Sequence, residues 1–211
     1  MKDQRSTTLG YYDQHARSAA SQYEQVDFSP VLDTVRTVMS LPAQVLELGC
    51  GSGRDAAALL ASGYDVIALD GSRAMISEAI RLHPELQDRL HHHVLPERFR
   101  FGAGQFDAVL AFAVIMHLAR EQIGTCIREI NRVTKPGGLF VVSVNTCRNE
   151  LNEEGVDRAG RYFTVMPAAQ WAELLSSAGF DSERTEVSSD IGGRPGIEWV
   201  TFVARKTDVE S

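Results

Sequence analysis

The sequence predicts an α/β fold in which a doubly wound, mostly parallel sheet carries a C-terminal antiparallel hairpin. Segments of strand and helix character alternate from residue 44 to residue 144, a cluster of glycines follows the first strand segment, and the last two strand segments have no helix between them. Parallel strands need a crossover that is usually helical, whereas consecutive strands can pair directly as an antiparallel hairpin. These observations favour helices on both faces of the sheet and a hairpin at one edge.

Two helices are expected before the sheet, at residues 11–23 and 28–39, because apolar side chains recur there with helical spacing. Apolar runs of strand length then occur at residues 44–48, 64–69, 90–95, 106–112 and 139–144. Helical patterns separate these runs at residues 56–61, 74–82 and 121–133. The run at residues 106–112 is almost continuously apolar, as expected for a central parallel strand covered on both faces.

The C-terminal part of the chain departs from this alternation. Lys135-Pro136-Gly137-Gly138 predicts a turn before the fifth strand. A helix is expected at residues 167–178, and strands follow at residues 179–187 and 199–204. Because no helix lies between these two strands, they are predicted to form the antiparallel hairpin.

The composition is that of an ordinary globular protein, with 211 residues, 44% of them hydrophobic and 23% charged. We expect a single domain over residues 1–211, with residues 1–42 as a helical leader or lid. The net charge is −7 and the Lys and Arg residues are scattered, which argues against nucleic acid as a partner. No apolar run reaches the roughly 20 residues that span a bilayer and residues 1–10 lack signal-peptide features, so we expect a cytoplasmic protein with no membrane partner. The oligomeric state is not indicated.

Neither the cysteines nor the histidines form a recognisable metal pattern. Cys50, Cys126 and Cys147 lie far apart without a Cys-x-x-Cys pair, so we interpret them as reduced thiols. The run from His91 to His93 lies in a predicted strand, where consecutive side chains alternate between faces, and no acid or cysteine accompanies it at ligand spacing. We therefore predict no metal site.

The glycine cluster after the first strand indicates a ligand site. Ligands of open α/β sheets bind beyond the carboxyl ends of the strands, and glycines let the backbone turn sharply and approach a ligand closely. A dinucleotide-binding loop that begins with Gly49 and Gly51 would have its third glycine at position 54, where this chain has Arg54. The acid Glu47 just before the glycines is a poor neighbour for a pyrophosphate but a good one for a ligand that bears an ammonium and a sulfonium.

A second candidate anchor is Asp70, which ends the second predicted strand about twenty residues after the glycine loop. Doubly wound folds place an acid there that hydrogen-bonds ribose hydroxyls. The alternative is an acid at the N-terminus of the following helix. The loop and Asp70 together indicate a nucleoside-containing ligand more strongly than either does alone.

Four motifs in this order resemble the class I S-adenosylmethionine-dependent methyltransferases, in particular the small-molecule type with a compact domain. The motifs are Val45-Leu46-Glu47-Leu48-Gly49-Cys50-Gly51-Ser52-Gly53, Leu69-Asp70-Gly71-Ser72, Phe106-Asp107-Ala108-Val109 running to His117-Leu118, and Lys135-Pro136-Gly137-Gly138-Leu139-Phe140. The resemblance covers about residues 45–179. It implies a Rossmann-like methyltransferase fold, S-adenosylmethionine as cofactor, S-adenosylhomocysteine as product and a small-molecule methyl acceptor.

The resemblance also implies a set of cofactor-binding residues. They are Tyr12, Glu47, Gly49, Cys50, Gly51, Gly53, Asp70, Gly71, Ser72, Met75, Leu95, Ala111 and Phe112. In this interpretation the glycine loop supports the methionine and ribose portions, Glu47 orients the amino group and Asp70 binds the ribose hydroxyls.

Other positions in the set have less specific roles. Met75 packs against the adenine or is plain core, Ala111 and Phe112 lie beside the sulfonium, and Tyr12 closes over the cofactor. Similar enzymes often have an acid after the third strand that binds the adenine amino group, whereas this chain has Leu95-Pro96, so backbone atoms near Leu95 are expected to serve instead.

For catalysis, positioning of an activated donor is the main requirement, and His117 is the candidate general base. The alternative is a structural histidine that caps the following helix. Arg158 and Arg161 would suit an anionic acceptor, although exposed arginines are often simply solvated.

The sequence leaves three other functions open. One is a non-catalytic S-adenosylmethionine-binding protein with the same fold, because fold alone does not decide function. A nicotinamide-dependent oxidoreductase is disfavoured by Arg54. A methyltransferase for toxic oxyanions is the third, because the glycine loop continuing into Arg54 is also similar to that of tellurite-resistance enzymes. The methylated atom is not indicated.

Overall fold

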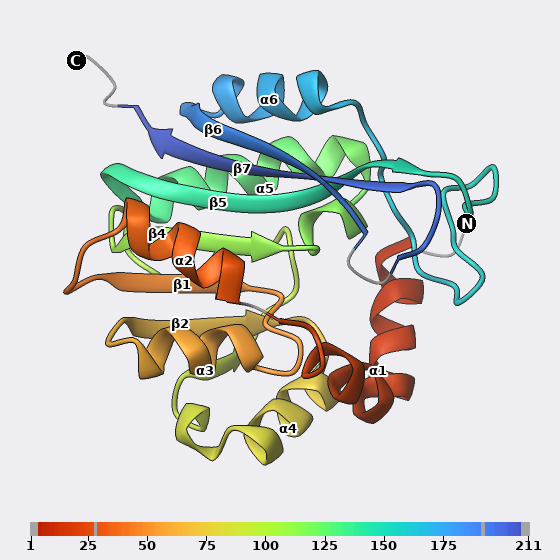
Figure 1. Ribbon diagram of the computed structural model, residues 1–211, viewed down its shortest axis with the longest axis horizontal. Helices are drawn as coiled ribbons and strands as arrows, with labels where there is room; N and C mark the ends of the chain where they lie inside the picture. The colour runs from red at the N-terminus through yellow and green to blue at the C-terminus, as the bar shows by residue number, and fades with distance from the viewer. Residues whose placement is uncertain (1–3, 28, 191–192, 208–211) are drawn as a thin grey trace.

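A seven-stranded sheet with the strand order β3-β2-β1-β4-β5-β7-β6 organises the computed structural model, which describes residues 4–27, 29–190 and 193–207 (Figure 1). The strands are β1 (Gln44–Leu48), β2 (Asp65–Asp70), β3 (Leu90–His92), β4 (Phe106–Phe112), β5 (Thr134–Arg148), β6 (Phe180–Ser189) and β7 (Ile197–Lys206). Strands β1 to β5 pair in parallel, and β7 pairs antiparallel with both β5 and β6. This confirms the predicted doubly wound sheet with its C-terminal antiparallel hairpin.

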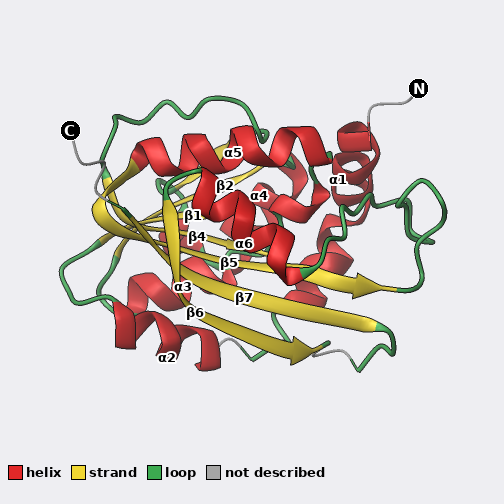
Figure 2. Cartoon of the chain, turned by 90° about the horizontal axis from the view of Figure 1, so that it is seen from above, coloured by secondary structure: helices red, strands yellow, loops and turns green. Residues whose placement is uncertain are grey.

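Helices cover both faces of the sheet, as Figure 2 shows for α5 and α6 on one side and α2 and α3 on the other. The helices are α1 (Gln4–Tyr23), α2 (Ser29–Val38), α3 (Arg54–Ala61), α4 (Arg73–Leu82), α5 (Arg120–Val133) and α6 (Ala168–Ser177), with short 3-10 turns η1 (Pro84–Leu86) and η2 (Ile115–His117). The predicted helix over residues 28–39 is found as α2, and Phe28 itself lies outside the described residues.

The central strands are apolar throughout because each of their faces is buried. In β4, Val109 packs on the side of α5 and α6, while Ala108 and Leu110 pack on the side of α2, α3 and α4. All three side chains are fully buried. Parallel strands covered on both faces give this continuous apolar pattern, so the sequence interpretation of residues 106–112 is correct.

Several predicted strand boundaries differ from the structure, most of all those of β5 and β3. The turn expected at residues 135–138 lies within β5, where the pairing with β4 jumps from Phe106 opposite Thr134 to Ala108 opposite Leu139. Gly137 has a φ of +69°, so the strand makes a local excursion there rather than beginning after it. Strand β5 also extends to Arg148 because β7 pairs along its second half, and β3 ends at His92 rather than residue 95.

The two leader helices occupy different places. Val35 and Met39 of the α2 region pack in the sheet core with Val45 and Leu59, whereas α1 packs on α4 and reaches the carboxyl ends of the strands. Of these two helices, α1 is the one whose residues line the cavity at the strand ends.

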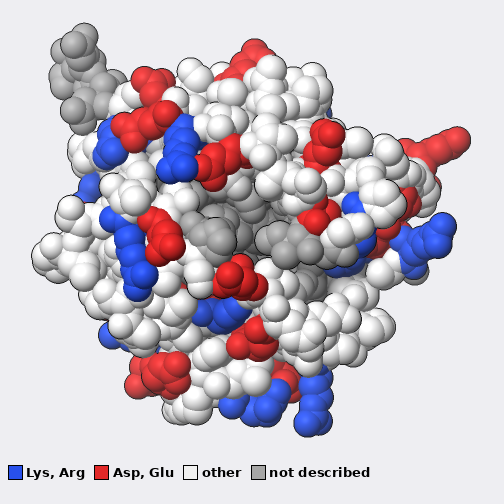
Figure 3. All heavy atoms as spheres, in the orientation of Figure 1, with Lys and Arg blue, Asp and Glu red and all other residues white. Residues whose placement is uncertain are grey.

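The surface offers no broad field of one charge on the face that Figure 3 shows, where acidic and basic side chains are interspersed. Among the described residues, none of the helices is both long and apolar enough to cross a membrane.

Candidate active site

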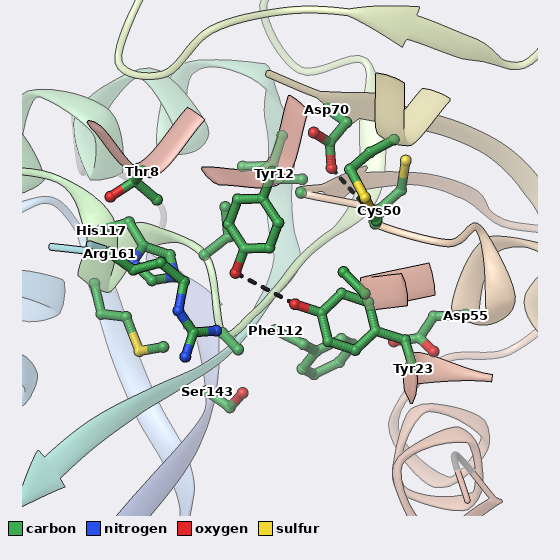
Figure 4. A pocket seen from close by; sticks show the side chains of 18 of the residues that line it. Thr8, Tyr12, Tyr23, Cys50, Asp55, Asp70, Phe112, His117, Ser143 and Arg161 are labelled. Carbon is green, nitrogen blue, oxygen red and sulfur yellow. Dashed lines mark hydrogen bonds between the residues drawn. The ribbon is translucent and has the colours of Figure 1, made fainter. Parts of the chain in front are cut away.

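A cavity of about 700 Å³ opens at the carboxyl ends of the parallel strands, underneath α1 (Figure 4). Its lining comes from α1, the glycine loop, the ends of β2 and β4, the second half of β5 and the hairpin β6–β7. This is the edge at which open α/β sheets bind ligands, because the loops after the strands diverge there.

The glycine loop adopts backbone conformations that other residues rarely tolerate. Gly49, Gly51 and Gly53 have φ values of +66°, +56° and +83°. A Cβ atom on Gly49 would lie 2.5 Å from Cγ2 of Val114, and one on Gly51 would lie 3.3 Å from Cδ2 of Tyr23. The loop therefore needs glycine for its left-handed turns and for the close approach of neighbouring groups.

Asp70 connects the end of β2 to this loop. Its Oδ2 atom accepts a hydrogen bond of 2.9 Å from the Gly51 backbone N–H, and its Oδ1 atom accepts one of 2.8 Å from the Ser72 N–H. Burial raises the pKa of Asp70 to about 6, although these two hydrogen bonds act in the opposite direction. Each carboxylate oxygen has a further lone pair, so Asp70 can still accept ligand hydroxyls.

Glu47, in β1, is a buried acid without a complete set of partners. Its side chain is 3% exposed, and its Oε2 atom has no hydrogen-bond partner in the described part of the chain. Burial, followed by the nearby Asp55 charge, raises the pKa of Glu47 well above its usual value. A buried acceptor that lacks a donor is costly, and a ligand ammonium would satisfy it.

Arg54 joins the glycine loop to the end of α1. Its Nη1 atom donates to the backbone oxygens of Tyr23 at 2.6 Å and Val26 at 2.9 Å, and its Nε atom lies 2.5 Å from Oδ1 of Asp55. Arg54, which occupies the position of the third glycine of a dinucleotide-binding loop, therefore attaches the end of α1 over the cavity.

Helix α1 contributes two tyrosines that meet across the cavity, as Figure 4 shows. The hydroxyl of Tyr23 donates to that of Tyr12 at 3.3 Å. Burial is the main reason that the pKa of Tyr23 is raised, so its hydroxyl stays protonated at neutral pH. These phenols form part of the cavity wall formed by α1.

His117 is held in one tautomer beside the other end of the cavity. Its Nδ1 atom lies 2.6 Å from the backbone oxygen of Tyr162, and because a carbonyl oxygen can only accept, Nδ1 carries the proton. The Nε2 atom of the neutral ring is then an acceptor. Burial lowers the pKa of His117 to about 4, against the effect of that hydrogen bond. Helix α5 begins after Ala119, so His117 does not act as its N-terminal cap.

Two arginines lie near His117 around the Phe163 ring. The guanidinium carbon of Arg148 lies 4.0 Å from the ring centroid, that of Arg161 lies 5.5 Å from it, and the His117 ring lies 4.5 Å from it. Both arginines line the cavity, whereas Arg158 is exposed and does not. Of the two arginines singled out in the sequence, only Arg161 is therefore placed to contact an acceptor.

Most of the predicted site residues line this cavity: Tyr12, Glu47, Gly49, Cys50, Gly51, Asp70, Gly71, Met75, Leu95, Phe112 and His117. Three do not. Gly53 packs against Leu86 and Ala79, Ser72 caps α4 by accepting from the Met75 N–H, and Ala111 is buried in the core. Gly53 and Ser72 therefore lie in the loops behind the cavity, and Ala113 rather than Ala111 lines it, so a role of these three residues in cofactor binding stays a prediction.

Several lining residues were missed in the sequence, among them Thr8, Tyr23, Asp55, Ser143, Arg148 and Trp199. They come from α1, α3, β5 and β7, and none lies in a recognisable motif. A polar residue near the carboxyl end of a predicted strand was the only available signal, and it applies to Ser143 and Arg148.

The histidine run and the cysteines have ordinary surroundings. Nε2 of His92 lies 3.1 Å from the Gly71 backbone oxygen, and Nε2 of His93 lies 2.9 Å from that of Glu97. The three cysteines are free thiols.

The doubly wound sheet and the cavity with its glycine loop and two acids define the methyltransferase class of Rossmann-like proteins. Residues 45–138 match a family model described as a methyltransferase domain. The chain therefore carries a methyltransferase domain over these residues, which confirms the predicted family.

Individual proteins show the extent of this similarity. The magnesium-protoporphyrin O-methyltransferase of Rhodobacter capsulatus is 34% identical over 123 residues, which is 54% of this chain and 54% of that protein. A protein of Mycolicibacterium smegmatis described as a probable S-adenosylmethionine-dependent methyltransferase is 34% identical over 143 residues, 67% of this chain and 53% of its own. The chain thus spans about half the length of the curated relatives it matches.

A solved structure covers nearly the whole chain. The 1,6-didemethyltoxoflavin-N1-methyltransferase of Burkholderia thailandensis, with 1,6-didemethyltoxoflavin and S-adenosylhomocysteine bound, superposes with a TM-score of 0.78 over 96% of this chain and 88% of its own. The sequence identity is 24%, so this likeness shows a shared fold.

Proposed function

We propose that the protein transfers the methyl group of S-adenosylmethionine to a small-molecule acceptor in the cavity beneath α1. The observation that carries this proposal is the pair of acids at the ends of adjacent strands around a left-handed glycine loop. Glu47 is buried and Asp70 is half-buried. Glu47 has an unpartnered oxygen for an ammonium, and Asp70 has lone pairs for two ribose hydroxyls.

The residues around these acids fit the rest of the cofactor. Met75 and Leu95 offer apolar contacts for the adenine, while Gly51 leaves room where a side chain would meet Tyr23 and Met75. Phe112 and Ala113, at the end of β4, lie where the reacting methyl group would be held. When bound, S-adenosylmethionine supplies an activated methyl group, because the electron pair of the breaking carbon–sulfur bond stays on sulfur.

His117 is the proposed general base. Its Nε2 atom is an acceptor because Tyr162 fixes the proton on Nδ1, and its low pKa keeps the ring neutral at physiological pH. As the new bond from oxygen to the methyl carbon forms, His117 accepts the proton that an acceptor hydroxyl loses. The Phe163 ring is tilted against the imidazole with a centroid distance of 4.5 Å, and the Tyr12 ring makes an edge-on contact at 6.2 Å.

The size of the cavity supports a small acceptor. Its volume of about 700 Å³ must hold both cofactor and acceptor, and it lies within the range usual for small-molecule sites.

We also propose that the chain acts as one domain in the cytoplasm, where its three free thiols would stay reduced.

Calorimetry with S-adenosylhomocysteine tests the cofactor part of the proposal. We expect a dissociation constant in the micromolar range, which corresponds to a binding free energy of about −7 to −8 kcal/mol. Gly51→Val should abolish binding, because its side chain would be strained at φ +56° and would enter the cavity. A cooperative thermal melt of the variant serves as the folding control, and normal binding by folded Gly51→Val would exclude this loop as the site.

Turnover tests the catalytic part. Release of S-adenosylhomocysteine from S-adenosylmethionine in the presence of an acceptor panel should be detectable, and His117→Gln should lower kcat by roughly 10²- to 10⁴-fold without changing cofactor affinity. Cofactor binding with no methyl transfer to any acceptor would instead support the non-catalytic alternative.

A further inference from the structure

The end of the cavity opposite the glycine loop contains a buried guanidinium with an unused donor. The Arg148 side chain is 2% exposed, and its Nε atom has no hydrogen-bond partner among the described residues. Its Nη2 atom pairs with Glu150 and lies 3.7 Å from Oδ2 of Asp157. An unsatisfied N–H on a buried cation is costly unless a ligand accepts from it.

Arg161 lies beside Arg148 and shares its surroundings. Its Nη2 atom lies 2.7 Å from the same Asp157 oxygen, and both guanidinium groups contact the Phe163 ring. Its guanidinium points into the cavity beside Tyr12 (Figure 4). Asp157 therefore lies close to both guanidinium groups, on the side away from the cavity.

The two ends of the cavity differ in their balance of lining charges. Arg148 and Arg161 lie at one end, where the lining also includes Asp190 and Arg194, which pair with each other. Glu150 and Asp157 are not part of the lining, whereas the two arginines that they hold are. Glu47 and Asp70 line the cofactor end, together with the acid Asp55, which Arg54 partly neutralises. The acidic end suits the cationic groups of the cofactor, so the basic end faces the acceptor.

We propose that the methyl acceptor carries a carboxylate group and that Arg148 and Arg161 bind it, which places the acceptor's nucleophilic atom near Nε2 of His117. This inference rests on the proposed function. The Phe163 ring contacts all three side chains, so a small molecule can reach the arginines and the imidazole together.

Two physical arguments favour a carboxylate as an anchor. Guanidinium groups bind planar carboxylates with paired N–H donors, and Arg148 and Arg161 are already partly neutralised by Glu150 and Asp157, so a single negative charge matches them better than the double charge of a phosphate. Hydrogen bonds to both arginines also hold the carboxylate's lone pairs, which makes another atom of the acceptor the better nucleophile.

Titration of matched acids and amides tests the proposal. The probes are 4-hydroxybenzoate, 3-hydroxybenzoate, phenylacetate and succinate, each beside its uncharged amide, with phenyl phosphate as the dianionic comparison. Aromatic acids are included because Tyr11, Phe163 and Trp199 line this end of the cavity. Each probe is titrated into the protein alone and into the protein saturated with S-adenosylhomocysteine.

The variants are Arg148→Lys and Arg161→Lys, which keep the positive charge but lose the planar fork. Arg158→Lys is the matched control, because Arg158 lies in the same loop as Arg161 but does not line the cavity. The lysine variants keep a cation beside Glu150 and Asp157, and a cooperative melt verifies their folding. Arg148→Met, where it folds, removes the charge as well.

We expect at least one acid to bind roughly tenfold or more tightly than its amide, and Arg148→Lys and Arg161→Lys to weaken the acid, but not the amide, by about tenfold. Arg158→Lys should leave both affinities unchanged. Equal binding of acids and amides, unchanged acid affinity in both variants, or no binding of any acid at millimolar concentration would refute the carboxylate site. Tighter binding of phenyl phosphate than of every acid would refute it in favour of a dianion.

Failure of the proposed function has a different signature. If S-adenosylhomocysteine does not bind, the methyltransferase proposal fails, yet the titrations of the protein alone still measure acid binding at the arginines. If S-adenosylhomocysteine binds normally and the acids behave as their amides do, only the carboxylate inference is lost.

Discussion

Asp70 affects both the free energy of unfolding and the affinity for the cofactor, and these two effects change in opposite directions as pH rises. Its pKa is about 6 in the folded chain, against about 3.9 for an unperturbed aspartate. Between these values the folded state binds more protons than the unfolded state, so this residue lowers the free energy of unfolding as pH rises from about 4 to about 6. Ligand hydroxyls donate more strongly to the ionised carboxylate, so cofactor affinity should rise over the same range.

Asp70→Asn should therefore weaken binding of S-adenosylhomocysteine at about pH 8 by roughly 1.5 to 3 kcal/mol, because it removes a charged acceptor from the ribose. The variant should also lose most of the fall in affinity that the natural protein shows below about pH 6. Calorimetry at about pH 5 and pH 8 measures both effects. The Asp70 charge contributes to the raised pKa of Glu47, so the difference between the two proteins measures Asp70 together with its effect on Glu47. Identical pH profiles would show that Asp70 holds only the loop backbone.

At the scale of elements, α1 is attached to the rest of the fold at both ends. Near its start, Oγ1 of Thr8 accepts from the Tyr162 N–H at 2.9 Å, and near its end the backbone oxygens of Tyr23 and Val26 accept from Arg54. Between these ties, Ala16, Ala19 and Ala20 pack against Met75 of α4. Helix α1 is thus held by Arg54, next to the glycine loop, at one end and by the loop that contains Tyr162 at the other.

Arg54→Lys should loosen the C-terminal end of α1, because an ammonium cannot reproduce the fork that joins Asp55 to two backbone oxygens. We expect faster amide hydrogen exchange at residues 20–27 and about tenfold weaker binding of S-adenosylhomocysteine. Arg17→Lys, an exposed position on the same helix, is the control. Unchanged exchange at residues 20–27 would mean that the alanine contacts alone fix this end of α1.

At the scale of the whole molecule, one sheet joins all the described strands and both of its faces are packed. Phe140 of β5 is fully buried and its ring lies 5.4 Å from that of Phe180 in β6. Strand β5 links the parallel part of the sheet to the hairpin, since it pairs with β4 on one side and with β7 on the other. This continuity supports the proposal of a single cooperative domain.

Phe140→Ala should lower the free energy of unfolding by about 3 to 5 kcal/mol, because it removes a buried ring and leaves a cavity. Far-ultraviolet circular dichroism and tryptophan fluorescence should shift together in denaturant, as they do for one cooperative unit. Leu41→Ala, at a side chain that is 52% exposed, should change stability by less than about 0.5 kcal/mol. Separate transitions for the two probes would contradict the single-domain proposal.

The strands and the glycine loop could be predicted from the sequence because they depend on short segments. Continuous apolar runs predicted the buried strands, and the spacing of Gly49, Gly51 and Asp70 predicted the loop and the acid that meet at the ends of β1 and β2. These succeed because periodicity, left-handed backbone and a strand-to-helix turn are set by a few neighbouring residues.

Contacts between side chains that are far apart in the sequence became visible in the tertiary structure. Arg148 follows no motif, and its role depends on Asp157, Arg161 and Phe163 folding back over the end of β5. Tyr23 reaches the cavity because α1 packs on α4, which comes later in the chain. The turn predicted at residues 135–138 is present as an excursion of β5. Gly137 keeps a left-handed φ there, and pairing with β4 before and after the excursion places it within the strand. Such convergence depends on long-range packing, which no short stretch of sequence encodes.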